Sequence, residues 1–180
     1  MLIMATTAIV SCTPGSGKNP FGKKVLATTI KVKASDDLIA ASDIEITYKG
    51  EGGIDVTDTI TSTYWMKRVF NDTFPTVIGR PEYRLLIKPD AKFDNDRCDL
   101  TLSISYMNPL KQWEEQLIDI DDVASSKVAA YLEAHEQSMS VLVKKQATDV
   151  YKVYIKDGDF ECDHILNPEQ LQEPSKETER

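Results

Sequence analysis

Apolar residues that recur at every second position constrain the fold of this chain most strongly. In residues 43–50, Ile44, Ile46 and Tyr48 alternate with polar residues, and four apolar residues do the same in residues 99–106. Successive side chains of a β-strand point to opposite faces, so this alternation is typical of a strand with one buried face and one solvated face. The chain is therefore predicted to be mainly β.

The firmest local prediction is a β-hairpin. Residues 43–50 lead into Gly52 and Gly53, which suit a tight turn, and then into a threonine-rich strand that carries Ile54, Val56 and Ile60. Further strands are predicted at residues 24–34, 65–70, 83–88, 99–106, 141–144 and 150–156. Four prolines, at positions 75, 81, 89 and 109, fall between these strands, where a missing amide donor harms no ladder. Short strands separated by turns predict an antiparallel β-sandwich, immunoglobulin-like or transthyretin-like.

One segment has helical spacing instead. Asp121 or Asp122 could cap a helix at about residues 122–138. Its apolar stripe would comprise Val128, Tyr131, Leu132, His135 and Met139. We expect this stripe to dock on a sheet.

Length and charge limit the domain organisation and the partners. The chain has 180 residues, which is enough for one core, so a single β-rich domain is predicted over residues 24–166. Residues 167–180 are polar and acidic, and a disordered tail is predicted there. The formal charge of the whole chain is -8. Binding to nucleic acid depends on clustered Lys and Arg, so an acidic chain is not expected to bind it.

The amino terminus resembles that of a bacterial lipoprotein. The first ten residues, MLIMATTAIV, have the length of a signal-peptide core and are too short to span a bilayer. The segment Ile9-Val10-Ser11-Cys12 at its end is similar to a lipobox. Ile9 replaces the usual leucine, and no Lys or Arg precedes the apolar core. The resemblance implies a signal peptide over residues 1–11, lipid on Cys12 and a tether over residues 12–23. It places the protein in the cell envelope, at the outer membrane or cell surface; the alternative is a buried amino-terminal strand.

The tether contains a segment similar to part of a phosphate-binding loop. Gly15-Ser16-Gly17-Lys18 matches half of that motif, but Cys12 stands where the motif needs glycine and Asn19 where it needs Ser or Thr. Pro20 and Gly22 follow where a helix should open. No nucleotide is expected to bind, and no cofactor is predicted.

The remaining cysteines and the two histidines allow few sites. Cys98 and Cys162 are a candidate disulfide in an oxidising envelope, or stay reduced as in many anaerobes. Cys162, His164 and Asp159 are the only metal candidates, and an acidic turn is the simpler interpretation. A second acidic loop, at residues 90–99, lacks the glycine and terminal glutamate of a calcium hand.

No catalytic residue is assigned from the sequence. His135 is expected to be a packing residue, and no serine lies in a nucleophile elbow. Tyr64, Trp65 and Trp113 are candidate glycan contacts, although core or edge aromatics are commoner. The short stretch 58–60, Asp-Thr-Ile, is similar to an O-glycosylation acceptor of some Gram-negative envelope proteins.

A second resemblance concerns the fold. The stretch from Ile46 to Gly50, the Gly-Gly turn, the threonine-rich strand and Trp65 resemble small immunoglobulin-like envelope modules, among them accessory subunits of actinobacterial lipid exporters. It implies an immunoglobulin-like fold. The function predicted from the whole sequence is that of a lipid-anchored, non-catalytic module that binds an envelope protein or glycan. The alternatives are a small carbohydrate-active or peptidoglycan-acting enzyme and a purely structural accessory protein. A pocket with converging carboxylates would favour the enzyme, and an exposed apolar patch would favour the binding module.

Overall fold

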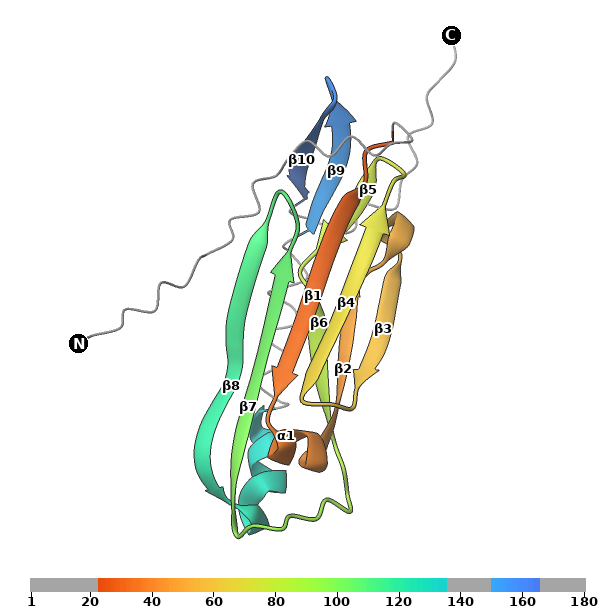
Figure 1. The fold of residues 1–180 in the computed structure, drawn as a ribbon. Helices are drawn as coiled ribbons and strands as arrows, with labels where there is room; N and C mark the ends of the chain where they lie inside the picture. Colours follow the sequence, from red (N-terminus) through yellow and green to blue (C-terminus); the bar gives the residue numbers. More distant parts are fainter. Residues whose placement is uncertain (1–22, 136–149, 166–180) are drawn as a thin grey trace, which may run out of the picture.

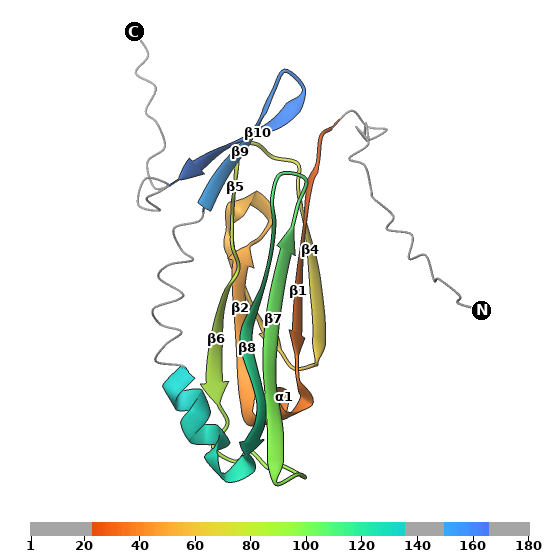
Figure 2. The same ribbon diagram turned by 90° about the vertical axis from the view of Figure 1, so that its left-hand side faces the viewer.

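The computed structural model describes residues 23–135 and 150–165, and the chain is mainly β in these ranges. The strands are β1 (Leu26–Ala34), β2 (Ser42–Lys49), β3 (Asp55–Ile60), β4 (Tyr64–Asn71), β5 (Thr76–Gly79), β6 (Glu82–Ile87), β7 (Arg97–Met107), β8 (Gln112–Ala124), β9 (Val150–Lys156) and β10 (Asp159–Ile165). They form three antiparallel sheets, with the orders β4-β1-β7-β8, β3-β2-β6 and β10-β9-β5. In Figures 1 and 2 the first two sheets lie one in front of the other, with the third at one end.

The two larger sheets share one hydrophobic core. Every second residue of β7, from Cys98 to Tyr106, is buried, as are Ile44, Ile46 and Tyr48 of β2. These side chains belong to one cluster, which also includes Ile30, Val32 and Ala34 of β1 and Tyr83 and Leu85 of β6. The apolar residues that alternate in the sequence are therefore those that face this core. The prediction of a mainly β chain is confirmed.

Most predicted strands are found, and the hairpin is confirmed. β2 and β3 pair antiparallel from Lys49–Asp55 to Ile44–Ile60. They are joined by a short 3-10 turn, η1 (Glu51–Gly53), in which Gly52 and Gly53 have positive φ. The predicted strands at residues 24–34, 65–70, 83–88, 99–106 and 150–156 correspond to β1, β4, β6, β7 and β9. The predicted strand at 141–144 lies outside the described residues, as do the predicted signal peptide, most of the predicted tether and the predicted tail.

The helical prediction needs correction at its start. Asp121 and Asp122 do not cap a helix but belong to β8, where Asp122 has a φ of 61° and pairs with Arg97. A 3-10 turn, η2 (Ser125–Lys127), follows, and the chain is α-helical from residue 128 to residue 135. Val128 and Leu132 enter the core as expected, whereas Tyr131 is 46% exposed. Met139 lies outside the described residues.

Four elements were not predicted. The short helix α1 (Asp36–Ala41) is capped by Ser35, whose Oγ accepts a hydrogen bond from the Leu38 amide. The strands β5, β8 and β10 were also missed. β8 pairs with β7 through two register shifts, between Cys98 and Leu100 and between Leu102 and Ser103, and these shifts break its alternation.

The small third sheet is attached through a second, smaller cluster. Leu26, Ile78 and Val153 are buried together, with Phe74 and Phe160 packed against them. Gly53, in the β2–β3 turn, lies close against the backbone of Val77 in β5. A Cβ added at Gly53 would lie 3.0 Å from the Val77 amide nitrogen. No side chain larger than hydrogen fits at this contact without a shift of backbone.

The central position of β7 yields a stability prediction. Leu102 is fully buried between the two large sheets, so Leu102→Ala should lower the free energy of unfolding by about 2–5 kcal/mol through lost burial and an unfilled cavity. The neighbouring Ser103 points to the other face, and Ser103→Ala should change this free energy by about 0.5 kcal/mol or less. Urea denaturation of both variants measures the difference; equal losses would contradict the assignment of the two faces.

Candidate functional site

The outward face of the four-stranded sheet carries an unusual set of side chains. Strand register places Tyr64, Met66, Arg68 and Phe70 of β4 beside Lys33, Lys31, Thr29 and Ala27 of β1. On the other side of β1, Met107 of β7 lies beside Thr29. We call the set Lys31, Lys33, Tyr64, Met66, Arg68, Phe70 and Met107 the β4 face.

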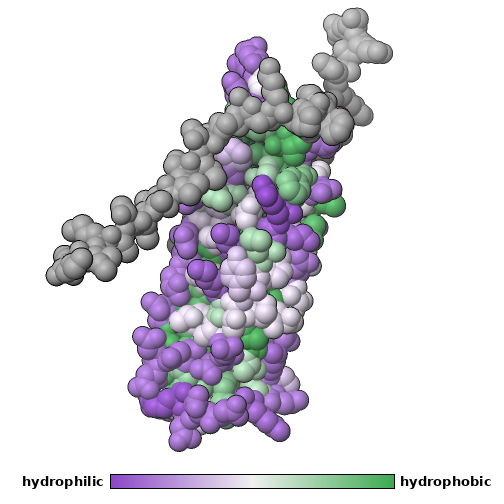
Figure 3. All heavy atoms as spheres, in the orientation of Figure 1, coloured by the Kyte–Doolittle hydropathy of each residue, from purple (hydrophilic) through white to green (hydrophobic). Residues whose placement is uncertain are grey.

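Four large apolar side chains of the β4 face are exposed. The exposed fractions are 50% for Tyr64, 54% for Met66, 47% for Phe70 and 49% for Met107. Figure 3 shows this side of the molecule, where green and pale spheres are interspersed with purple ones along the middle and upper part. On this face the apolar side chains are interspersed with Lys31, Arg68 and Thr29. A mixed face of exposed aromatic, methionine and arginine side chains is a candidate contact surface for another molecule.

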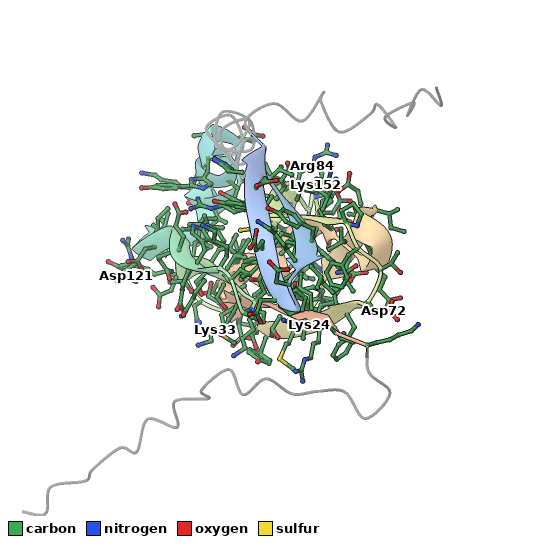
Figure 4. All side chains as sticks on the ribbon, turned by 90° about the horizontal axis from the view of Figure 1, so that it is seen from above. Lys24, Lys33, Asp72, Arg84, Asp121 and Lys152 are labelled. Carbon is green, nitrogen blue, oxygen red and sulfur yellow. The ribbon has the colours of Figure 1, made fainter. Side chains whose placement is uncertain are left out.

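The charge of the β4 face differs from that of the whole chain. The outward residues of β1 and β4 include Lys31, Lys33 and Arg68 and no carboxylate, although the chain carries a formal charge of -8. Carboxylates lie instead along β8, where Glu114 and Asp119 point outward. Figure 4 shows Lys33 on one side of the molecule and Arg84, from β6, on the other.

The β4 face also borders an open sheet edge. In the described part of the chain β4 pairs with β1 alone. The β1–β4 ladder runs from Leu26–Asn71 to Lys33–Tyr64 without a register shift. Such an edge presents unpaired amide and carbonyl groups in a regular row.

A polar and aromatic cluster supports β4 from the core side. The Tyr48 hydroxyl donates a 2.8 Å hydrogen bond to Asp58 Oδ2, and Lys67 Nζ lies 3.9 Å from the same oxygen. The Trp65 ring packs against the Tyr48 ring, with centroids 6.1 Å apart. These contacts tie β2, β3 and β4 together, so the outward side chains of β4 stand on a fixed strand.

The structure does not bring the three predicted glycan contacts together. Tyr64 points outward from β4, whereas its neighbour Trp65 points into the core. Trp113 lies on β8, at the opposite edge of the sheet, and also packs against the core, with Arg80 over its ring at 4.9 Å. The described structure therefore does not gather the three residues on one surface, and only Tyr64 belongs to the β4 face.

The candidate disulfide is not formed. Cys98 and Cys162 are free thiols. Cys98 lies in the main core at the start of β7, and Cys162 packs against the small cluster on β10. Figure 1 places these two strand segments at opposite ends of the molecule, so a bond between them would require refolding.

The metal candidates have other contacts. Asp159 pairs with Lys24 at 3.0 Å, and the His164 ring stacks on Tyr151 with centroids 4.8 Å apart. Cys162 packs against apolar side chains. Within residues 23–135 and 150–165, no three His, Cys, Asp or Glu side chains converge as a metal site would need, and this includes the acidic loop at 90–99.

Two hollows in the surface do not resemble a catalytic pocket. One, of about 320 Å³, lies beside β6 and the helix at 128–135, and Lys88 is its only ionisable lining residue. Lys88 Nζ donates to the Ile39 carbonyl at 2.6 Å. The other, shallow and about 420 Å³, lies along the same helix beside Tyr131 and His135, and burial lowers the pKa of His135. Neither lining includes a carboxylate.

One carboxyl group has a raised pKa outside these hollows. Burial raises the pKa of Glu82, Asp55 raises it further, and Lys49 opposes the shift. Lys49 and Asp55 form an ion pair at 2.8 Å. Glu82 of β6 pairs with Thr47 of β2, so the Glu82 carboxyl group lies on a sheet face and not in a cleft.

Comparison with protein-family models, with curated proteins and with solved structures finds no match to this chain. No helix in the described part of the chain is long and apolar enough to cross a membrane. The β4 face thus has to be interpreted from its own chemistry. Sequence analysis did not single out Met66, Arg68, Phe70 and Met107, because β4 has apolar residues on both of its faces and alternation alone cannot tell which face is solvated.

Two tyrosines near the core give a matched prediction. Tyr83 is buried, and its hydroxyl has no hydrogen-bond partner among the described residues. Tyr83→Phe should therefore leave the free energy of unfolding unchanged or raise it. Tyr48→Phe removes the bond to Asp58 and should lower it by about 1–2 kcal/mol. Urea denaturation at pH 7 compares the two variants, and equal losses would contradict this assignment.

Urea denaturation in alkaline solution should distinguish Tyr83→Phe from the wild type. Burial, together with the charge of Glu115, raises the pKa of Tyr83 to about 12. Because the folded pKa exceeds the unfolded value of about 10, the stabilisation is complete below pH 10 and is lost as the pH rises toward 12. Tyr83→Phe should therefore lose less stability than the wild type over this interval.

Proposed function

We propose that this chain is a non-catalytic interaction module that binds a protein or glycan of the cell envelope through the β4 face. The observation that carries the proposal is the exposed row Tyr64, Met66 and Phe70, interrupted by Arg68, along a sheet edge that no other described strand pairs with. Exposed aromatic, methionine and arginine side chains of this kind suit contact with a partner. The described residues support the enzyme alternative less than they support the interaction module, since the two hollows beside the helix at 128–135 contain no converging carboxylates.

We infer further that the fold is a β-sandwich of the immunoglobulin-like or transthyretin-like class. The common core of the two larger sheets supports this class. The chain passes from one sheet to the other between β1 and β2 and returns between β3 and β4. Such crossing connections are usual in antiparallel sandwiches.

The module is proposed to stand on a lipid anchor at Cys12, with residues 12–23 as tether. The support is the similarity of Ile9-Val10-Ser11-Cys12 to a lipobox after an apolar run. A tethered module exposes its faces close to other envelope components, which raises their effective concentration.

The anchor is tested by substitution of the cysteine. The wild-type chain, expressed in a bacterium with a lipoprotein pathway and fed labelled palmitate, should incorporate the label and sediment with membranes. Cys12→Ala should abolish the label, and Cys98→Ala should not. An unlabelled wild-type chain of full mass would contradict the anchor.

The interaction surface is tested by photo-crosslinking in the native host. A benzophenone amino acid at position 66 or 70 should form adducts with one or a few partners, because both side chains are exposed on the β4 face. The matched control is position 131, where Tyr131 is equally exposed on the helix. Digestion of the adducts with protease or glycosidase identifies a protein or glycan partner. The same adducts at position 131, or none at 66 and 70, would contradict the proposal.

A further inference from the structure

The open edge of β4 has a form suited to pairing with another strand. β4 has eight residues, no proline and an unbroken register with β1. The opposite edge strand of the same sheet, β8, is interrupted by register shifts. Bulges and short strands are common means of blocking an edge, and β4 has neither. An inward-pointing charge is another, and β4 carries one in Lys67, which lies 3.9 Å from the Asp58 carboxylate.

Charge decides what kind of strand the edge can accept. Arg68 points outward at the middle of β4, and its guanidinium lies 5.1 Å from the centre of the Phe70 ring. Lys67 points to the other side, 3.9 Å from the Asp58 carboxylate. Lys31 adds a cation beside Met66. Opposite charges that face each other across two strands stabilise the pair, so the complementary strand is acidic.

A second copy of β4 does not satisfy this requirement. Facing residues of an antiparallel pair point to the same side, so the even-numbered residues of β4 must meet even-numbered ones. The two longest twofold registers then place Lys67 opposite its own copy, or Arg68 opposite its own copy. Like charges in such positions are destabilising, and every other register pairs fewer residues.

We propose that β4 accepts an extended, acidic segment of a partner protein as an added antiparallel strand. Two consecutive carboxylates of this segment face Arg68 and Lys67, and apolar residues beside them lie opposite Phe70 and Met66. The pattern of the segment is apolar, any residue, acidic, acidic, apolar. This inference deepens the proposed function and rests on it, since it names the partner of the same β4 face. Main-chain hydrogen bonds supply the affinity and the side chains supply the selectivity.

The test uses a defined probe, the peptide acetyl-Thr-Val-Thr-Glu-Glu-Tyr-Thr-amide, added to the full chain labelled with ¹⁵N. The expected result is saturable shifts of the backbone amides of β4 in NMR spectra. Replacement of both glutamates by lysine should weaken binding at least about tenfold. Methylation of one alternate set of peptide amides should abolish binding, and methylation of the other set should not, because only one set faces β4.

Matched variants of the protein locate the charge contact. Arg68→Glu should weaken binding about tenfold, and a peptide with lysine in place of the first glutamate should restore it. Arg84→Glu is the control, because Arg84 is exposed on the other large sheet, 4.0 Å from Glu45. The restored binding separates a lost contact from a damaged fold.

Several results would overturn the inference. They are the absence of β4 shifts at millimolar peptide, equal binding of the lysine peptide, and equal effects of the two methylated sets. Shifts of β4 with a neutral oligosaccharide such as chitotetraose, and none with the peptide, would indicate a glycan instead. If the peptide fails while adducts form at positions 66 and 70, the interaction module stands and only the acidic strand is rejected. If the adducts are also absent, both proposals fail.

Discussion

The burial of every second side chain of β1, β2 and β7 is the constraint on which the rest of the structure depends. β1 and β7 lie in the middle of one sheet and β2 in the middle of the other, so their inward residues meet in one core. A shift of one residue in any of these strands would exchange its core face for its solvent face. The register of the edge strands, and with it the position of every outward side chain, follows from these central pairings.

The β4 face shows how an edge strand can be both stable and open. Its inward residues Trp65 and Val69 contribute to the core, and Lys67 reaches Asp58 on β3. The outward residues are therefore not needed to hold the strand. This separation allows Met66 and Phe70 to remain exposed without loosening the sheet, and it gives the cations a fixed spacing. A partner that binds here would meet a surface that is already ordered, which lowers the entropic cost of binding.

The sequence predicted the strands whose pattern comes from a single buried face, such as β2 and β7. It did not predict β8, because register shifts separate Trp113 and Glu115 from the later inward residues. It placed a helix cap at Asp121 or Asp122, since aspartate suits a cap, but both residues belong to β8, where Asp122 pairs with Arg97. The candidate site could not be predicted from the sequence for a related reason. Which side of Tyr64–Asn71 faces water depends on the pairing with β1, and that pairing joins segments far apart in the chain.

The two ladder partners of β1 have a consequence for how the chain reaches its folded state. Ile30 pairs with Lys67 on one side and with Tyr106 on the other. The ladders of β1 therefore form only with strands that lie much further along the chain. Contacts between distant parts of a sequence slow folding, because a long loop must close before any favourable contact forms. The main core also contains Ile118, Val123 and Leu132, so it cannot be complete until Leu132 has been synthesised. During synthesis the nascent chain therefore lacks its full core for most of its length and remains open to proteases and chaperones over that interval.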